Sequence, residues 1–451
     1  MIKIVYLNSS KPIKKSSINE QNKIELQKIR LSDGFIKKYQ LNFDKIILHF
    51  GNWKQEFERM DDNTLSDQEI GLPKGSPAIS IPETLSFEIR VQGNIVHIGP
   101  FIVFIAKKSS RHLSEKSLED YKNRFNHYET INGLVLICSS EDIDINKQTI
   151  SGYYYNPSAE KANEKWLKGI FPYPDAVFKK IRIPSKQKVN LRKIIGNKVF
   201  NTNSFSKLDL WKACSSDEKV QKLLPVTEKY QTVADLEAML DKFSTVYLKP
   251  IRGMKGIGIY LVKQDPKGFL LINHQKDKYL LKTIKEVEKF LGNKINKGYI
   301  IQQGIPTSYK NKHFDFRLYF QKTAKKKWIC QGSIGRIAQE ESIVTNLNHV
   351  AHLSTGEKAI KIIFKVNHTE AKLILDDTIN SCIDLCNLLD KKLGHFGDVA
   401  IDVIIDHNHI PWVLEVNNMY GKRSLYIMKD NELIQTLHTT PLKYAKVLAG
   451  F

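Results

Sequence analysis

The chain has 451 residues, of which 41% are hydrophobic and 10% aromatic, a composition that excludes a disordered polymer and provides for two or three domains with buried cores. Lys and Arg number 69 against 48 Asp and Glu, a formal net charge of +21, which favours polyanionic partners without choosing among nucleic acid, acidic polymers and acidic membranes. No apolar run approaches the roughly 20 residues of a membrane span, and the alternating start MIKIVYL is typical of a strand rather than of a leader, so we expect a soluble protein that is not exported.

Short strands predominate in residues 1–99, where we predict a β-rich N-terminal domain with strands at residues 2–8, 44–52 and within 78–100. Residues 100–204 then alternate strand and helix: an apolar strand at 101–106, a charged helix at 113–128 and a strand at 133–140. This alternation predicts an α/β unit with parallel strands. The segment 166–184 contains several prolines and many apolar side chains, and we expect it to connect two layers.

The rest of the chain, residues 205–451, predicts one mixed α/β domain with early helices at residues 208–214 and 233–243. The five cysteines of the chain are odd in number, widely separated and without a CxxC pair, so they predict neither a disulfide framework nor a zinc site. A reducing compartment follows. Cys382 and Cys386 lie four apart on an expected helix, a spacing that suits a metal, but their leucine and isoleucine neighbours favour core packing.

A strand–loop–strand segment at residues 245–263, with a glycine-rich loop, is the first candidate for a phosphate-binding site. An apolar strand ends at Lys249, the loop follows, and a second strand begins after it. Glycine lets backbone N–H groups form concave nests for phosphate oxygens. A lysine that precedes the glycines excludes a Walker A loop, and the following strand excludes a dinucleotide fingerprint. The candidate phosphate-binding residues are Lys249, Arg252, Gly253, Lys255, Gly256 and Gly258; an ordinary glycine-rich hairpin with surface cations is the alternative.

A predicted hairpin at residues 398–418 is the second candidate. A turn around Asn408 would pair Ile405 with Trp412 and, in the same register, Asp402 with Glu415, with Cβ atoms roughly 5 Å apart. Asn417 would share the face of Glu415. Opposed carboxylates among apolar neighbours need a cation between them, and their oxygens suit Mg²⁺. A hairpin edge with exposed acids is the alternative.

The order of these motifs resembles the ATP-grasp superfamily over about residues 205–430. Lys249 and its glycine loop precede a strand with Gln302 and Gln303, Asp-Phe-Arg at 315–317, Asp402 and Glu-Val-Asn at 415–417. The resemblance implies that Lys249 contacts ATP phosphates and that Asp402, Glu415 and Asn417 bind Mg²⁺ or, alternatively, Mn²⁺. It also implies an adenine pocket and phosphate-holding arginines, as in RimK-type and glutathione-synthetase-type ligases. The residues implied are, for adenine, Gln302, Gln303 and Ile305; for the transferring phosphate, Arg317 and Arg336; for metal, Asp402, Glu415 and Asn417. The later Asn346 belongs to the same resemblance.

Further segments extend the resemblance through the front half of the chain. HIGPFIVFIA near Gly99, GYYY from Gly152, FPYPDAVFKKI from Phe171 and LLPVT at 223–227 resemble the YheC/YheD family of endospore coat-associated ATP-grasp proteins. The implied fold is α/β and α+β, with a β-rich domain at 1–99, a pre-ATP-grasp-like α/β domain at 100–204 and an ATP-grasp catalytic domain at 205–451. The family also implies association with a developing spore.

The favoured function is therefore an ATP- and Mg²⁺-dependent carboxylate–amine ligase that acts through an acyl phosphate, with Arg317 and Arg336 stabilising the transferred group. Two alternatives stay open: a kinase with a hydroxyl acceptor, and a non-catalytic coat or polyanion-binding protein. We expect ATP and an acidic or carboxylate-bearing substrate as partners, with spore coat proteins as further partners. We expect no membrane or nucleic-acid partner, and a cytoplasmic location with coat association.

Overall fold

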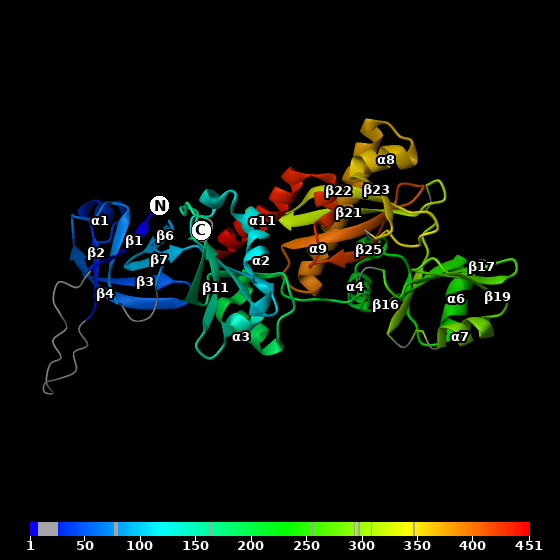
Figure 1. Ribbon diagram of the computed structural model, residues 1–451, viewed down its shortest axis with the longest axis horizontal. Helices are drawn as coiled ribbons and strands as arrows, with labels where there is room; N and C mark the ends of the chain where they lie inside the picture. The colour runs from blue at the N-terminus through cyan, green and yellow to red at the C-terminus, as the bar shows by residue number, and fades with distance from the viewer. Residues whose placement is uncertain are drawn as a thin grey trace. The chain divides into compact units, whose positions relative to one another are not determined.

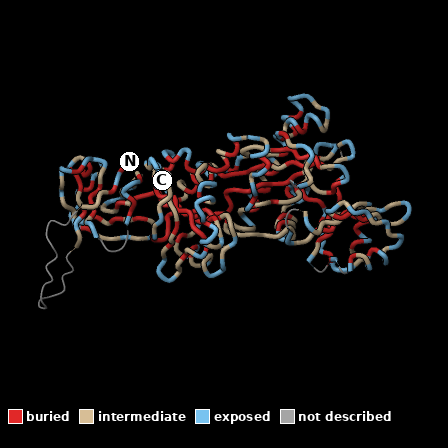
Figure 2. Tube along the Cα trace, viewed as in Figure 1, coloured by how far each residue is buried: buried red, intermediate tan, exposed pale blue. Residues whose placement is uncertain are grey.

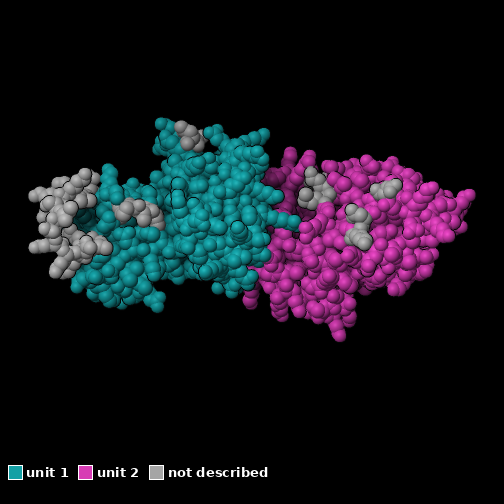
Figure 3. Space-filling view, turned by 90° about the horizontal axis from the view of Figure 1, so that it is seen from below, with its two compact units in different colours: residues 1–202, 323–326, 438–451 teal, residues 203–322, 327–437 magenta. Residues whose placement is uncertain are grey.

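The computed structural model describes residues 1–7, 26–75, 80–161, 164–253, 256–292, 294–295, 298–307, 309–345 and 348–451. The chain forms two compact units, one of residues 1–202, 323–326 and 438–451 and the other of residues 203–322 and 327–437 (Figure 3). The division into three domains at 1–99, 100–204 and 205–451 remains a proposal. In the described part of the chain, no helix is long and apolar enough to cross a membrane.

An N-terminal sheet in the first unit has the strand order β1-β5-β2-β4-β3-β7-β6. Helix α1 (Asp33–Tyr39) follows β2, with Ser32 accepting a hydrogen bond from the Phe35 amide at its start. Alternating burial along β3 shows why these residues form strands, since Ile46, Leu48 and Phe50 face the core. The strands are β1 (Lys3–Leu7), β2 (Lys28–Leu31), β3 (Lys45–Phe50), β4 (Trp53–Asp61), β5 (Glu69–Pro73), β6 (Glu88–Gln92) and β7 (Ile95–Gly99).

A second sheet in this unit, in the order β10-β11-β9-β8-β13-β14, has a parallel centre. Strand β8 pairs in parallel with β9 and β13, and β13 with β14, which confirms the predicted parallel α/β arrangement. Every residue of β9 is buried, as expected for a strand covered on both faces. The strands are β8 (Phe101–Lys107), β9 (Leu134–Ser139), β10 (Ile143–Asp144), β11 (Thr149–Tyr155), β12 (Trp166–Pro172), β13 (Ala176–Lys179) and β14 (Val199–Phe200).

Two expectations for this region are wrong. The helix predicted at 113–128 is only α2 (Glu115–Glu119), followed by 3₁₀ turns at Lys122–Phe125 and Tyr128–Thr130, because asparagine and other weak helix formers follow it. The segment 166–184 is not a connection between layers but holds strands β12 and β13 and leads into α3 (Ser185–Ile195). Its prolines stand at the end of β12, between the strands and before α3, positions at a strand end or outside the strands where proline is tolerated.

In the second unit, a flap sheet has the order β15-β20-β16-β17-β18-β19. Helix α6 (Val233–Phe243), predicted from the sequence, buries Leu236, Met239 and Leu240 at helical spacing against this sheet. Helices α4 (Lys207–Cys214) and α5 (Glu218–Gln221) precede the sheet, and α7 (Ile284–Gly292) packs beside α6 (Figure 1). The strands are β15 (Thr227–Lys229), β16 (Thr245–Pro250), β17 (Tyr260–Asp265), β18 (Gly268–Asn273), β19 (Lys278–Leu281) and β20 (Tyr299–Gln303).

A hairpin sheet, in the order β23-β22-β21-β24-β25, completes the second unit. The long helix α9 (His368–Lys392) contributes Cys382 and Cys386, both fully buried, to the core of this sheet, which confirms core packing of these cysteines. Figure 2 shows the buried residues concentrated along the strands. The remaining elements are β21 (Phe314–Lys322), β22 (Trp328–Ala338), β23 (Val350–Thr355), β24 (Asp398–Ile405), β25 (Pro411–Asn417), α8 (Gly356–Phe364), α10 (Arg423–Met428) and α11 (Asn431–Ala449). Helix α11 belongs to both units, because its residues from 438 on are part of the first.

Candidate active site

A cavity of about 560 Å³ in the second unit is lined by residues of both the flap sheet and the hairpin sheet. Most of the residues predicted to bind ATP and metal line this cavity: Lys249, Gly256, Gln302, Gln303, Ile305, Arg317, Arg336, Asp402, Glu415 and Asn417. Residues separated by almost 170 positions in the sequence therefore share one cavity. Arg252, Gly253 and Gly258 are not part of the lining, and Lys255 and Asn346 lie outside the described residues.

Lys249 lies near the end of β16, where the strand delivers a buried ammonium group to the cavity. Its Nζ donates a hydrogen bond to Oε1 of Gln302 at 2.6 Å, and Gln302 in turn donates from Nε2 to the Thr227 hydroxyl at 3.0 Å. Burial, together with the nearby Lys207, lowers the pKa of Lys249 to about 8. Lys249 makes no ion pair with any residue that the structure describes, so its charge is available to an anion.

The loop after β16 has glycines in a conformation that other residues avoid. Gly256 and Gly258 have φ angles of 76° and 78°, in the left-handed region that favours glycine. A Cβ atom at Gly258 would lie 2.8 Å from the Tyr299 hydroxyl and 3.2 Å from Cγ of Pro250. The two strands that flank this loop, β16 and β17, pair in antiparallel fashion, as a strand–loop–strand flap requires.

An apolar wall lies beside Lys249 in the same cavity. Tyr247 and Ile259 come from the flap, Ile305 follows β20, and Ile343 and Val344 come from the segment after β22. Ile343 packs with Leu261 and Ile272 of the flap sheet in a small apolar cluster. An apolar cavity wall beside strand backbone suits a heteroaromatic ring. The Gln303 side chain accepts a hydrogen bond from the Val226 amide.

Asp402 and Glu415 are direct partners across β24 and β25, as predicted. The predicted partner of Ile405 is wrong, because Ile405 pairs with Pro411 rather than Trp412, and a β-bulge between Asp402 and Val403 restores the predicted register beyond it. A bulge places one extra residue on one strand. The pairing of the two acids therefore holds although the turn is one residue shorter than expected.

Two arginines surround Asp402. Arg317, its partner across β21 and β24, donates from Nε to Oδ1 and from Nη2 to Oδ2, both at 2.7 Å. Arg336 donates to both oxygens of Asp315 at 2.6 Å and also lies 3.3 Å from Oδ1 of Asp402. Burial alone would raise the pKa of Asp402, but the two guanidinium groups outweigh it and lower the pKa to about 2. Asp402 is therefore ionised at physiological pH.

Arg336 is buried more deeply than Arg317, with 5% of its side chain exposed against 18%. Burial would lower its pKa, but the carboxylates of Asp315 and Asp402 raise it. The Thr345 hydroxyl adds a further hydrogen bond to Asp315. Each arginine donates to its acid from Nε and Nη2. Among the described residues neither Nη1 group has a partner, so both can donate to a ligand.

The residues at the metal position fit a hard divalent cation. Asp402 is ionised, Glu415 faces it, and the Asn417 carboxamide makes no hydrogen bond with any side chain or backbone group in the described ranges. Carboxylate and amide oxygens suit Mg²⁺, which keeps several waters or phosphate oxygens as further ligands. Across the described residues, no group of three or more His, Cys, Asp or Glu side chains forms a metal site; the predicted set has two acids and one amide.

Several polar residues of the cavity lining were not predicted, among them Lys207, Arg423 and Ser424. Lys207 lies 3.4 Å from Glu415, and Arg423 and Ser424 follow the hairpin. Lys207 begins α4 next to Ser206, which forms a capping box with Asp209, so the helix start was recognisable but the direction of the lysine was not. Ile343 and Val344 were also missed, because they come from an irregular segment whose place depends on tertiary packing.

The family model described as YheC/D like ATP-grasp matches residues 196–448. The endospore coat-associated protein YheD of Bacillus subtilis (strain 168) is 24% identical over 366 residues, 76% of this chain and 77% of the relative. The endospore coat-associated protein YheC of the same strain is 24% identical over 230 residues, 50% of this chain and 62% of the relative. The crystal structure of VanG D-Ala:D-Ser ligase from Enterococcus faecalis is 14% identical, with 77% of this chain and 98% of that chain covered and a TM-score of 0.43.

Proposed function

The chain belongs to the YheC/D-like ATP-grasp family, and from this premise we propose that it is an ATP- and Mg²⁺-dependent carboxylate–amine ligase. One observation carries the proposal: the cationic groups of Lys249, Arg317 and Arg336 line the same cavity as the opposed acids Asp402 and Glu415. Such a cavity offers cations for phosphate oxygens and acids for the metal that accompanies them.

In this proposal the nucleotide lies along the flap sheet. The adenine ring occupies the apolar wall, where Gln302, Gln303 and Ile305 line the cavity, and the backbone of β20 supplies hydrogen bonds. Lys249 and Lys207 bind phosphate oxygens. The glycine loop, with Arg252, Gly253, Lys255, Gly256 and Gly258, closes over the phosphates as a lid that excludes water from a reactive intermediate.

The chemical steps use the carboxylate of a substrate and the γ-phosphate of ATP. A carboxylate oxygen forms a bond to the γ-phosphorus while the bond to the β-phosphate oxygen breaks, which gives an acyl phosphate and ADP. An amine then attacks the acyl carbon, phosphate leaves, and the amine loses a proton to give an amide. The Nη1 groups of Arg317 and Arg336 stabilise the charge on the transferred phosphoryl group.

The metal position belongs to the same proposal. Asp402, Glu415 and Asn417 would hold Mg²⁺, or alternatively Mn²⁺, which neutralises phosphate charge when it is bound. Because Asp402 already accepts hydrogen bonds from two arginines, we expect its remaining lone pairs and the more accessible Glu415 to face the metal.

Partners and location rest on the relatives and on charge. The two Bacillus subtilis relatives are named endospore coat-associated, so we propose a cytoplasmic protein that associates with the spore coat. The net charge of +21 favours an acidic substrate, because exposed cations attract anions over about 8 Å at physiological salt.

A coupled assay tests the function. ADP release is measured with candidate carboxylates in the presence of Mg²⁺, and hydroxylamine is added to capture an acyl phosphate as a hydroxamate. We expect hydroxamate to form only with ATP, Mg²⁺ and a carboxylate. A stable phosphate ester formed from a hydroxyl compound would instead establish the kinase alternative, and binding of ATP without any transfer would establish the non-catalytic one.

A further inference from the structure

The charged groups of the cavity do not balance one another. In the described part of the lining there are five Lys or Arg side chains and three carboxylates. Three pairs neutralise each other: Arg317 with Asp402, Arg336 with Asp315, and Lys207 with Glu415. The two cations that remain are Lys249, which the proposed function assigns to phosphate, and Arg423.

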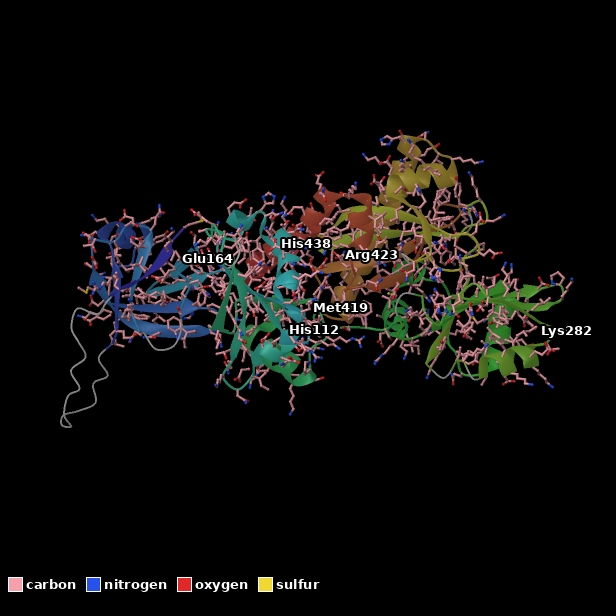
Figure 4. The ribbon with its side chains drawn as sticks, viewed as in Figure 1. His112, Glu164, Lys282, Met419, Arg423 and His438 are labelled. Atoms are coloured by element: carbon pink, nitrogen blue, oxygen red, sulfur yellow. The ribbon has the colours of Figure 1, made fainter. Side chains whose placement is uncertain are left out.

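Arg423 lies just beyond the predicted metal ligands. Strand β25 ends at Asn417, and the lining continues through Met419 to Arg423 and Ser424 at the start of α10. Met419 and Arg423 are labelled in Figure 4. Arg423 is exposed and makes no hydrogen bond, ion pair or ring contact with a residue in the described ranges. Its guanidinium group is therefore available to bind an anion through two parallel hydrogen bonds.

Ser424 is a second free polar group at this place. It lines the cavity, is only 3% exposed, and its hydroxyl makes no hydrogen bond with the residues that the structure describes. A hydroxyl that lines the cavity without such a partner can donate a hydrogen bond to a carboxylate oxygen. Met419, in the same lining, is 44% exposed and offers apolar surface beside the two polar groups.

We propose that Arg423 and Ser424 bind a second carboxylate of the substrate, distinct from the carboxylate that is activated. This inference rests on the proposed function and specifies its substrate class as dicarboxylic, with an aliphatic spacer against Met419. The activated carboxylate must reach the phosphoryl group, which the buried Arg317 and Arg336 hold, whereas Arg423 is solvent-exposed at the cavity edge. The neighbouring Lys422 lies over the Tyr420 ring and outside the lining. Arg423 is therefore the cation available at this place, and its single positive charge matches the single negative charge of one carboxylate.

Binding measurements test this assignment without turnover. Calorimetry is carried out with Mg²⁺ and a non-hydrolysable ATP analogue, and the probes are succinate, glutarate and adipate, each compared with its monoamide. A triglutamate peptide and its fully amidated counterpart form a second arm. We expect at least one dicarboxylate or the acidic peptide to bind about tenfold more tightly than its amide, the effect of one charge-assisted hydrogen bond. A preference among the small acids identifies the substrate as a free dicarboxylic acid, and a preference among the peptides identifies it as an acidic peptide.

Variants assign the preference to the residue. Arg423→Gln should remove the tenfold preference while binding of the ATP analogue and the melting temperature stay unchanged, and Ser424→Ala should reduce it. Lys429→Gln removes the same charge at the other end of α10, outside the lining, and should keep the preference. Equal binding of every acid and its amide, or a preference that survives in Arg423→Gln, would overturn the assignment.

Turnover separates this inference from the proposed function. With an active dicarboxylate, Arg423→Gln should raise KM about tenfold and leave kcat unchanged, because the interaction is uniform between ground and transition states. If monocarboxylates form hydroxamate with the same KM as dicarboxylates, the second-carboxylate site is refuted and the ligase proposal stays intact. Selective binding of dicarboxylates without any ADP release would refute the ligase proposal and leave the site intact.

Discussion

Asp402 and Glu415 lie opposite each other on β24 and β25, and each carboxylate is paired with a cation from a different element, Arg317 of β21 for Asp402 and Lys207 of α4 for Glu415. The two acids would repel each other if they were alone. Each acid therefore has a cationic partner of its own, and in the proposed function both carboxylates would hold the metal. Through Lys207 and Glu415, helix α4 forms an ion pair with the β24–β25 hairpin.

Replacing Asp402 by Asn should destabilise the protein, because it leaves the Arg317 guanidinium without its bidentate acid and removes one contact of Arg336. Breaking a buried pair by removing one partner costs about 3–5 kcal/mol. We expect the free energy of unfolding in urea, measured without nucleotide or metal, to fall by about 3 kcal/mol.

A surface pair provides the control for this change. Asp384 pairs with Lys219 at 2.7 Å, with 37% and 78% of the two side chains exposed, and Asp384→Asn should cost less than about 1 kcal/mol. An Asp402→Asn protein as stable as wild type would mean that Arg317 finds another partner.

Nucleotide binding should depend on divalent metal through Glu415. EDTA should weaken binding of a non-hydrolysable ATP analogue to the wild-type protein, and Glu415→Gln should weaken Mg²⁺-dependent binding by about tenfold or more. Titration calorimetry with and without Mg²⁺ measures both effects. Glu432→Gln, an exposed change at the start of α11, is the control; equal affinity in EDTA, or full activity of Glu415→Gln, would remove the metal assignment.

Closure of the glycine loop should be sensitive to a methyl group at Gly258. Its φ of 78° and the 2.8 Å approach of a Cβ atom to the Tyr299 hydroxyl predict that Gly258→Ala strains the loop by about 1 kcal/mol or more. We expect severalfold weaker nucleotide binding. Gly292→Ala, where an added Cβ meets nothing within 4 Å, should leave affinity unchanged.

Hydrogen exchange checks the same loop in the wild-type protein. Amides at residues 251–257 should exchange more slowly when nucleotide binds, because a lid that closes protects them. Exchange that is unchanged at saturating nucleotide would contradict the lid.

The family and the charged centre of the cavity were predictable because each depends on residue types at short spacing. The flap around Lys249 needs only a strand, glycines and a second strand, and the hairpin needs only two apolar runs and a turn. The resemblance drawn from these motifs is confirmed by the family model. Even so, the partner of Ile405 was misplaced, because a β-bulge beside Asp402 changes the register without any distinctive residue.

Other parts depended on tertiary structure and could not be predicted. Trp166–Pro172 forms a strand because β11 pairs with it, a partner that local composition does not reveal, so its prolines suggested a connection instead. Ile343 reaches the cavity from an irregular segment by packing on the flap sheet. Lys207 is one of many lysines, and only the helix direction set by α4 turns it toward Glu415.

The last prediction concerns the pH dependence of nucleotide binding. Burial and the nearby Lys207 lower the pKa of Lys249 from 10.5 to about 8, so this ammonium loses its proton in a range where an ordinary lysine stays charged. Between pH 8 and 10.5 the unfolded chain binds more protons at this residue than the folded chain, so the contribution of Lys249 to stability rises with pH over that range. Nucleotide binding has the opposite sign, because phosphate oxygens need the protonated amine.

Affinity for the ATP analogue at fixed Mg²⁺ should therefore be constant from pH 6 to 7 and fall as pH passes about 8, the pKa of Lys249 in the free protein. Because bound phosphate stabilises the ammonium, binding should also take up protons near this pH, which calorimetry in buffers of different ionisation enthalpy detects. Lys249→Arg keeps its charge throughout this range, so its affinity should no longer fall near pH 8 even if it is weaker overall. A wild-type affinity that stays flat to pH 9.5, or a decline that persists unchanged in Lys249→Arg, would show that the buried ammonium does not bind the phosphates.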